Sequence, residues 1–400
     1  MKTSKGKEAS LKDKEMAQSK VNVTSVYNKS EDYKPISGYS GFKEDPKKND
    51  KQIKQFKELI EDAPICDLQK LKKLAWSGVP AGKDFIAIGN DCCFAQKELR
   101  GVVWKILLEY LPLSKDKRDA VLLKKRQEYI SIQRFHFGEG KDDYRNENEK
   151  KTLKIIESDV LRTQPDCPLY HVDCIQKMLI RLLTIWHIRH PASGYVQGMN
   201  DLTCPFLAVF LSDYIAIDYD TFNVPEDFDK IITPEKLEEV EADMYYCLCK
   251  VLDGIQDNYT NAQPGTQRSV SKIREVLKRM DNDLLEHFEK EEINLMQIVI
   301  RWVFCLLIRE FPLKLGLRLF DTYISDDEGF TTLHIYVCTA ILLKWAQKIK
   351  KMQFHEIMLF LQNLPTKEWG AEDLQMIIAE AYVYKSLFES SNPMVTSKMK

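Results

Sequence analysis

The sequence predicts an all-α protein built around one large core. Apolar residues recur at helical spacing along almost the whole chain after Asp67. The sequence has no Asn-Gly or Asp-Gly pair flanked by segments that alternate apolar and polar residues, the usual signal for a β-hairpin. Its Asp253-Gly254 pair ends a helical pattern instead. No period of about 20–50 residues repeats, which argues against a solenoid. The 400 residues, 44% of them hydrophobic, are enough for many helices in one continuous or bilobed core.

Residues 1–60 differ in composition from the rest and are predicted to be a disordered polar tail. They are rich in Lys, Ser, Asp and Asn, and poor in Leu and in aromatic clusters. Such a segment buries too little apolar surface to offset the entropy lost on ordering. A weak contact with a membrane or a partner is the alternative for this tail. The first residues, Met1–Lys5, are polar, so we expect no secretory signal.

The predicted domain covers residues 67–390, with an N-terminal lobe of about 67–230 and a C-terminal lobe of about 231–390. Thr233-Pro234 gives the clearest helix start, an N-cap followed by proline at the first helical position. A charged loop is expected over residues 138–148. The predicted helices cover, in chain order, residues 68–75, 100–111, 116–137, 171–190, 234–252, 267–288, 294–309, 313–323, 330–348, 354–361 and 371–387.

Composition excludes several classes of function. The net charge is −2, so the chain offers no overall basic field for nucleic acid. Its ten cysteines form no C-x-x-C pair, which argues against zinc and for free thiols in a reducing, cytosolic setting. Two long apolar runs, Cys204–Ile217 and Ile293–Ile308, are interrupted by Asp213 and Arg301 and are too short to span a bilayer. We expect both to be buried helices.

Two further patterns fall short of a cofactor site. Gly78–Asp84 contains glycines and a lysine, but its spacing differs from that of a phosphate loop, and Asp84 replaces the hydroxyl that binds Mg²⁺. His187 and His190 lie three residues apart on one predicted helix, and no third metal ligand accompanies them, so a helix-end histidine pair is the better interpretation. We therefore expect no nucleotide, metal or other cofactor of the chain's own.

The segment Ile156–Arg162 places an arginine near the end of a predicted helix. Ile155, Ile156 and Val160 are expected to face inward, and Pro165 ends the helix shortly afterwards. Asp159 precedes Arg162 by three residues, so its carboxylate can hold the guanidinium in a fixed orientation. Judged from these residues alone, a surface ion pair or a charge that complements the helix dipole is the simpler interpretation.

The segment Pro191–Asp201 places a glutamine between two predicted helices. Gly194 and Gly198 permit tight turns or the close approach of another molecule. The amide of Gln197 can accept a hydrogen bond from water and donate one to a phosphate oxygen at the same time. An interhelix turn in which Gln197 caps backbone groups is the alternative. Asn200 and Asp201 are expected to cap the helix that begins at Leu202.

Together these segments resemble the signature patterns of the TBC domain, a module that activates Rab GTPases. Ile156, Asp159 and Arg162 match I-x-x-D-x-x-R. The second pattern, Y-x-Q-G-M, is matched by Tyr195, Gln197, Gly198 and Met199. A third pattern of the family, R-x-x-x-W, is matched by Arg100 and Trp104. The three occur in the family's order. The resemblance covers roughly Leu68–Leu387, and the segments His190–Tyr195, Arg309–Phe311 and Asp321–Tyr323 are similar to the Golgi-associated subgroup.

The resemblance implies a GTPase-activating protein that supplies two side chains in trans. Arg162 would neutralise charge on the phosphates of a GTP-bound Rab, and Gln197 would orient the attacking water. GTP and Mg²⁺ would belong to the partner GTPase. The alternatives are a catalytically inactive TBC scaffold that binds a Rab or another partner, and an unrelated all-α adaptor. The resemblance also implies a cytoplasmic protein in vesicle trafficking, peripheral at the Golgi or other endomembranes through the Rab.

The remaining motif residues are expected to support this pair. Asp159 would orient the segment of Arg162, and Arg100 would pair within the same framework. Tyr195 and Met199 would shape the glutamine loop or contact the Rab. Trp104 is expected to pack in the core.

Overall fold

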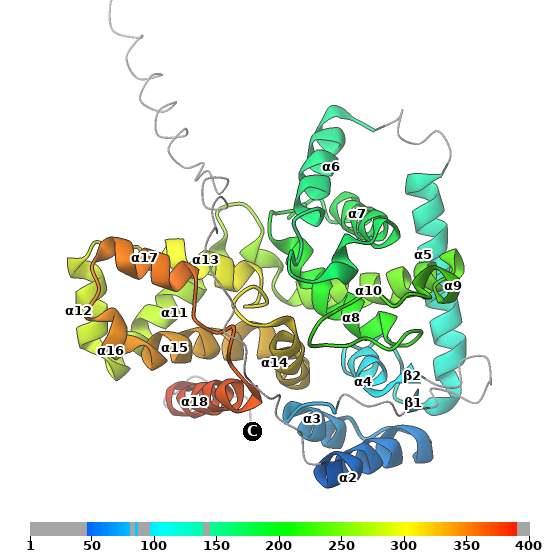
Figure 1. The fold of residues 1–400 in the computed structure, drawn as a ribbon, viewed down its shortest axis with the longest axis horizontal. Coiled ribbons are helices and arrows are strands. Elements are labelled where there is room, and N and C mark those ends of the chain that lie inside the picture. Colours follow the sequence, from blue (N-terminus) through cyan, green and yellow to red (C-terminus); the bar gives the residue numbers. More distant parts are fainter. Residues whose placement is uncertain (1–45, 81–84, 87–96, 139–144, 390–400) are drawn as a thin grey trace, which may run out of the picture. The chain divides into compact units, whose positions relative to one another are not determined.

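The computed structural model describes residues 46–80, 85–86, 97–138 and 145–389. All of them belong to one compact unit that begins at Glu44. The helices, labelled in Figure 1, are α2 (Pro46–Lys57), α3 (Leu68–Trp76), α4 (Leu99–Leu107), α5 (Arg118–Phe137), α6 (Glu147–Val160), α7 (Asp173–Arg189), α8 (Thr203–Leu211), α9 (Phe228–Ile231), α10 (Pro234–Gly254), α11 (Pro264–Met280), α12 (Asn282–Lys290), α13 (Leu295–Phe304), α14 (Leu313–Ser325), α15 (His334–Lys344), α16 (Ala346–Ile349), α17 (Phe354–Gln362) and α18 (Ala371–Glu389).

Short elements connect some of these helices. Within the described residues the strands are β1 (Phe85–Ile86) and β2 (Lys97–Glu98), an antiparallel pair of two residues each. The all-α prediction is therefore confirmed in substance. No helix in the described ranges is long and apolar enough to cross a bilayer. The 3₁₀ turns are Lys115–Lys117, Pro168–His171, Met199–Leu202 and Gln256–Asn258, and the π-helical turns are Glu58–Asp62 and Gly329–Leu333.

The predicted disordered tail extends too far into the chain. Residues 1–45 lie outside the described part, but α2 and the π-turn that follows it are folded. Phe56 and Ile60 are completely buried, and the Gln52 amide donates to the carbonyl of Gly78 at 2.7 Å. The apolar residues of this segment are few, but their helical spacing puts them on one face, which the overall polar composition concealed.

Most predicted helices are present, and several end differently. Thr233 caps α10 as expected, because its side chain accepts a hydrogen bond from the backbone N–H of Lys236. The predicted helix over 267–288 is instead two helices, α11 and α12. Asp281 separates them: its backbone is extended at φ −154°, and its carboxylate accepts from the N–H of Leu284 at 3.1 Å. A short N-cap residue can therefore break an otherwise continuous apolar stripe.

Two other predicted helices also differ from the structure: one is divided and one ends early. The segment 330–348 becomes a π-turn, α15 and α16. Helix α13 ends at Phe304 rather than at residue 309, because Leu306 and Leu307 have φ of 48° and 64°. A non-glycine residue in this region costs about 1–3 kcal/mol, so the surrounding structure must enforce the turn. Both leucines are fully buried.

The predicted boundary between two lobes near residue 231 does not match the packing. Helix α10 begins at Pro234 but packs against α5, α7 and α8, all from the first half of the chain. Helices α11, α13, α15 and α18 pack with one another. The change of packing partners therefore falls after α10, near Gly254. Helix α14 joins the two sets, since it contacts α3, α4, α8 and α18.

A buried carboxylate explains the R-x-x-x-W pattern. Asp321 of α14 accepts hydrogen bonds from Arg100 Nε at 3.1 Å and from Trp104 Nε1 at 2.7 Å. Its other oxygen accepts from the backbone N–H of Val79 at 2.9 Å. Arg100 and Trp104 are four residues apart, so one face of α4 presents both donors to one acceptor. This cluster joins α4 to α14 and is structural. Arg100 was predicted to pair within the framework of Arg162, and this is wrong, because its partner is Asp321.

A second group of buried charges joins α4, α5 and α10 to the end of α8. Lys105 Nζ lies 2.9 Å from Asp213 and 2.7 Å from Asp243. Arg126 donates to Asp243 at 2.8 Å, and the hydroxyl of Tyr110 donates to the same carboxylate at 2.7 Å. Burial would raise the pKa of Asp243, but Arg126 and Lys105 hold it well below its usual range. Each buried charge has opposite-charge partners, without which burial would be strongly destabilising.

Replacing Trp104 tests the buried cluster around Asp321. We expect Trp104→Ala to lower the free energy of unfolding by about 3–5 kcal/mol, because a fully buried indole is lost. Trp104→Phe keeps most of the ring but loses the Nε1–H donor, so it should cost about 1–3 kcal/mol. Urea denaturation measures both. Equal stability of Trp104→Ala and the wild type would contradict the assignment of Trp104 to the core.

His334 should make folding stability depend on acid pH. Burial lowers the pKa of His334 from 6.5 to about 4, and its ring contacts the hydroxyl of Tyr323 at 2.9 Å. The unfolded chain therefore binds the proton more readily, so stability is full above about pH 6.5 and falls as the pH drops towards 4. The loss is about 3 kcal/mol. Urea denaturation across this range should show a steeper decline in the wild type than in His334→Gln. Parallel profiles would contradict the prediction.

Candidate functional site

Helix α6 places Arg162 just beyond its C-terminal end. The helix begins with a capping box in which Asn146 and Glu149 bond to each other's backbone, so the predicted charged loop ends at residue 146. Val160 is the last helical residue, and the N–H of Arg162 donates to the carbonyl of Asp159 at 3.1 Å. The side chain of Arg162 remains 45% exposed. The arginine is therefore fixed at its backbone and accessible at its guanidinium.

The predicted ion pair between Asp159 and Arg162 is present. Arg162 Nη2 lies 2.5 Å from Asp159 Oδ1, and the carboxylate is almost completely buried. Ile156 and Val160 are buried beneath it, as expected. Ile155 was also expected to face inward and does not, because it is 49% exposed. One residue turns the helix by about 100°, so Ile155 leaves the apolar face that Ile156 occupies.

The glutamine segment follows α7 as a tight turn. Its two glycines, Gly194 and Gly198, have φ of 62° and 105°, which other residues adopt only with strain. A Cβ at Gly198 would lie 3.2 Å from the sulfur of Cys305. Gln197 is half-buried between them, and its amide makes no hydrogen bond to any residue that the structure describes. The interpretation of Gln197 as a cap for backbone groups is therefore not supported.

Asp159 connects the glutamine segment to the arginine segment. While one of its oxygens accepts from Arg162, the other accepts from the hydroxyl of Tyr195 at 2.8 Å. The amide nitrogen of Asn200 donates to the hydroxyl of Thr163 at 2.9 Å. Residues from both signature patterns therefore share one hydrogen-bond network around a buried carboxylate.

Asn200 and Asp201 do not cap the next helix as predicted. Both lie inside the 3₁₀ turn Met199–Leu202, whose N-terminal neighbour is Gly198. Asn200 bonds to the arginine segment instead. Asp201 is buried and accepts from Cys305 Sγ at 3.6 Å and from Arg309 Nη1 at 3.5 Å. Short polar side chains near a helix start often cap it, but here long-range partners occupy both.

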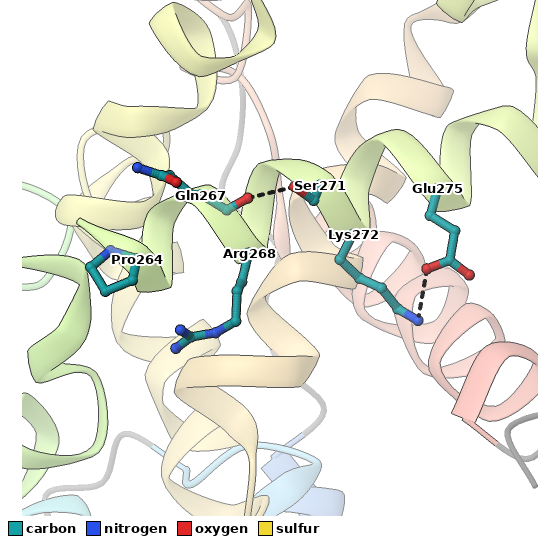
Figure 2. A pocket seen from close by; sticks show the side chains of 6 residues that line it. All are labelled: Pro264, Gln267, Arg268, Ser271, Lys272 and Glu275. Atoms are coloured by element: carbon teal, nitrogen blue, oxygen red, sulfur yellow. Dashed lines mark hydrogen bonds and ion pairs between the residues drawn. The ribbon is translucent and has the colours of Figure 1, made fainter. Parts of the chain in front are cut away.

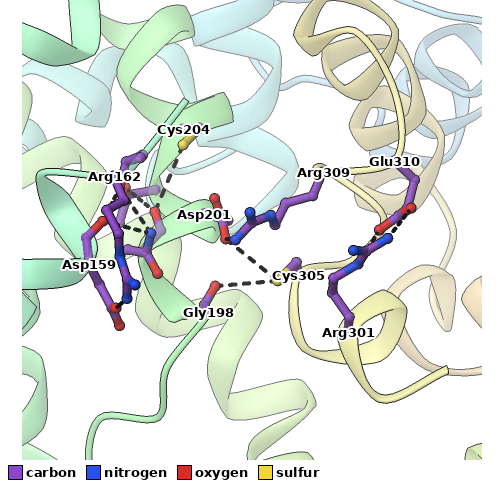
Figure 3. Close-up of polar contacts among 12 residues, drawn as sticks. Asp159, Arg162, Gly198, Asp201, Cys204, Arg301, Cys305, Arg309 and Glu310 are labelled. Atoms are coloured by element: carbon purple, nitrogen blue, oxygen red, sulfur yellow. Dashed lines mark hydrogen bonds and ion pairs between the residues drawn. The ribbon is translucent and has the colours of Figure 1, made fainter. Parts of the chain in front are cut away.

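Figure 3 shows how these contacts surround the glutamine segment. Asp159 and Arg162 lie on one side of Gly198 and Asp201, and Cys305 and Arg309 approach from the other. Cys305 Sγ also lies 3.7 Å from the carbonyl oxygen of Gly198. The glutamine segment is therefore held between α6 and the turn that follows α13.

Burial sets the protonation of the groups around the site. Burial raises the pKa of the Tyr195 hydroxyl well above its usual range, and the nearby Asp159 raises it further, so the hydroxyl remains a donor. Burial raises the pKa of Asp201, while Arg309 acts in the opposite direction. Burial also lowers the pKa of His187, whose Nδ1 accepts from the N–H of Tyr195 at 3.0 Å. A neutral His187 can accept this bond, and a protonated one cannot.

The remaining predicted residues have structural positions. Met199 is completely buried, and its sulfur accepts from the N–H of Val196 at 3.4 Å, so it shapes the glutamine loop. Arg100 and Trp104 belong to the Asp321 cluster and make no contact with this network. Four residues that contact the site were not among the predicted ones: Thr163, His187, Cys305 and Arg309. From the sequence, His187 is interpreted as part of a helix-end histidine pair and Arg309 as part of the subgroup resemblance, and neither interpretation predicts these contacts.

A shallow pocket lies elsewhere, along α11. Its volume is about 510 Å³, and all six lining residues belong to that one helix (Figure 2). Lys272 and Glu275 pair with each other across it at 3.4 Å. The pocket is a surface depression along one helix and lies apart from the arginine and glutamine segments. Among the described residues, no three His, Cys, Asp or Glu side chains gather as metal ligands would.

Comparison with known proteins shows the family. A family model described as the Rab-GTPase-TBC domain matches residues 97–350. The chain is 40% identical over 348 residues to GTPase-activating protein gyp1 of Schizosaccharomyces pombe, covering 85% of this chain and 62% of that protein. It is 40% identical over 339 residues to human TBC1 domain family member 22B, covering 84% and 62%. The chain thus spans less than two thirds of the length of these curated relatives.

Solved structures show the same fold. The crystal structure of the Ypt/Rab-GAP domain of Gyp1p superposes with a TM-score of 0.74 at 36% sequence identity, covering 85% of this chain and 99% of that chain. The chain therefore belongs to the Rab-GTPase-TBC domain family.

Removing the Tyr195 hydroxyl tests the link between the two segments. We expect Tyr195→Phe to lower the free energy of unfolding by about 1.5–3 kcal/mol, because a hydrogen bond to a buried carboxylate is lost. Tyr170→Phe is the matched control, since the Tyr170 hydroxyl donates to a neutral carbonyl, that of Cys204, at 2.8 Å. It should cost about 1 kcal/mol. Urea denaturation distinguishes them, and equal losses would contradict a special role for Tyr195.

Proposed function

We propose that this chain accelerates GTP hydrolysis by a Rab-family GTPase, with Arg162 and Gln197 acting in the partner's active site. One observation carries the proposal. The guanidinium of Arg162 is 45% exposed, and the half-buried amide of Gln197 makes no hydrogen bond to any described residue. The two segments that carry these side chains are joined directly by the hydrogen bond between Tyr195 and Asp159. The relative position of the two segments is therefore fixed before a partner binds. This lowers the entropy cost of placing both side chains at one reacting group.

Arg162 would stabilise charge that develops during phosphoryl transfer. The partner would hold GTP and Mg²⁺ in its own phosphate loop, and the planar guanidinium would donate to the phosphate oxygens. Asp159 contacts this group at Nη2 and fixes its orientation. An arginine supplied in trans contributes about 10³–10⁵ in rate in related systems. Such a contribution corresponds to roughly 4–7 kcal/mol of activation free energy.

Gln197 would orient the attacking water. An amide can accept from the water and donate to a γ-phosphate oxygen at once. The tight backbone of the segment, with glycines at 194 and 198, lets this side chain approach a partner closely. Tyr195 and Met199 would act indirectly, because the first links the segment to Asp159 and the second is buried beneath the loop.

The alternative is a TBC scaffold that binds a Rab without stimulating hydrolysis. The presence of both Arg162 and Gln197 favours catalysis, since a scaffold would not require this pair. We also propose a role in vesicle trafficking, with peripheral attachment to Golgi or other endomembranes through the GTP-bound partner. This rests on the membership of the Rab-GTPase-TBC domain family and on the resemblance of two sequence segments to the Golgi-associated subgroup. The particular Rab would be set by the surface around the two side chains.

Replacing the two side chains tests the mechanism. In single-turnover phosphate release with a panel of GTP-loaded Rab proteins, Arg162→Ala should lower the stimulated rate by about 10³–10⁵. Gln197→Ala should lower it by about 10²–10³, as the loss of one preorganised donor does elsewhere. Arg162→Lys should also be poor, because an ammonium lacks the planar fork of donors.

A matched arginine provides the control for this experiment. Arg279 is 57% exposed and pairs with Glu275 on the surface of α11, much as Arg162 pairs with Asp159. Arg279→Ala should leave the rate within about twofold of wild type, as expected for a weak surface pair. A wild-type protein that binds GTP-loaded Rabs without stimulating any of them would support the scaffold instead.

A further inference from the structure

The turn after α13 has an unusual backbone next to the glutamine segment. Leu306 and Leu307 are consecutive, fully buried and left-handed, with φ of 48° and 64°. Backbone hydrogen bonds close the turn, from Leu307 to Trp302 at 3.1 Å and from Ile308 to Cys305 at 3.0 Å. Such conformations persist only where the surroundings enforce them, and they concentrate at functional sites.

This turn presents two donors to the glutamine segment. Cys305 Sγ lies 3.7 Å from the carbonyl of Gly198 and 3.6 Å from the carboxylate of Asp201, and Arg309 Nη1 lies 3.5 Å from that carboxylate. Burial raises the pKa of the Cys305 thiol well above its usual range, so the sulfur keeps its proton.

The contacts act on the residues next to Gln197. Gly198 follows Gln197 directly, and a Cβ there would lie only 3.2 Å from Cys305 Sγ, so glycine allows the two to approach closely. Asp201 lies within the 3₁₀ turn that follows, where its N–H donates to the carbonyl of Gly198 at 3.2 Å. The backbone that carries the Gln197 side chain is thus fixed from the side opposite Asp159 (Figure 3).

We propose that Cys305 and Arg309 are positioning residues for Gln197: through Gly198 and Asp201, they hold the glutamine loop where its amide can meet the water in a partner's active site. The proposal rests on the proposed GTPase-activating function for its catalytic consequence. Its structural part, that the turn after α13 rigidifies the glutamine loop, stands separately. Cys305 and Arg309 are more than 100 residues from Gly198 and Asp201, so the second half of the chain controls part of the site in the first half.

The catalytic test separates positioning from general stability. Arg309→Met should lower the stimulated rate constant for hydrolysis by about 10–100-fold, because displacements near 1 Å are costly at a reacting centre. Binding of the partner loaded with a non-hydrolysable GTP analogue should change less than about threefold, since the exposed surface is kept. In a Gln197→Ala background, Arg309→Met should cause no further loss beyond about twofold, as expected for residues that act as a unit.

A neighbouring ion pair, between Arg301 of α13 and Glu310, supplies a matched control. Arg301 lies 2.7 Å from Glu310 and is about as exposed as Arg309, but it points away from the glutamine segment. Arg301→Met should lower the melting temperature at least as much as Arg309→Met while keeping the hydrolysis rate within about threefold. Rescue is available at Cys305: Cys305→Ser keeps a donor and should retain more activity than Cys305→Ala.

Hydrogen exchange gives a readout that does not depend on activity. The backbone amides of residues 195–203 should exchange at least about tenfold faster in Arg309→Met and in Cys305→Ala than in the wild type, because these substitutions loosen the glutamine loop. In Arg301→Met their exchange rates should not change. Unchanged exchange in Arg309→Met would overturn the proposal, whatever the activity. An equal loss of rate in the wild-type and Gln197→Ala backgrounds would also overturn it. A wild-type protein without stimulating activity would refute the proposed function. The hydrogen-exchange result alone would then decide whether Cys305 and Arg309 fix the glutamine loop.

Discussion

The two hydrogen bonds to the Asp159 carboxylate are the interaction on which the site depends. A buried carboxylate needs donors, and here the two donors come from different parts of the chain, Arg162 from the end of α6 and Tyr195 from the loop after α7. The hydrogen bonds to this one carboxylate therefore fix the relative position of two segments that are separated in the chain by helix α7. The Tyr195 hydroxyl keeps its proton because burial raises its pKa, so the link does not change with pH near neutrality.

The rest of the fold holds this link in place through similar buried carboxylates. Asp321 joins α4 to α14, and Asp243 joins α4, α5 and α10. Asp201 joins the glutamine segment to the turn after α13. Each lies where helices from distant parts of the sequence meet, and each accepts from two or more donors. Burying one such charge without its partners would be strongly destabilising. Each buried carboxylate therefore requires that the helices carrying its donors pack against it. The accessible side chains then rise from a rigid framework, as a preorganised site requires.

Local patterns predicted most of the helices, and the resemblance to the TBC patterns singled out Arg162 and Gln197, but neither predicted what surrounds these two residues. Helical spacing located α7, and the cap at Thr233 located the start of α10, because both signals lie within a few residues. The break at Asp281 is a local N-cap that the continuous apolar stripe concealed. The left-handed conformation of the buried Leu306 depends on tertiary packing. Asn200 and Asp201 are a further example. Their local sequence predicts helix caps, but the side chains of both bond to partners more than 30 residues away. The pairing of Arg100 with Asp321 spans 221 positions and leaves no local trace.

Affinity for a transition-state analogue tests the central claim most directly. A partner GTPase loaded with GDP, Mg²⁺ and aluminium fluoride mimics the transferring phosphoryl group, so a protein that supplies catalytic groups should bind it more tightly than the GDP form. We expect the wild-type protein to gain at least about 100-fold in affinity on addition of fluoride. Arg162→Ala and Gln197→Ala should lose most of that gain and keep their affinity for the GTP-bound partner. An undiminished gain in both variants would contradict the account.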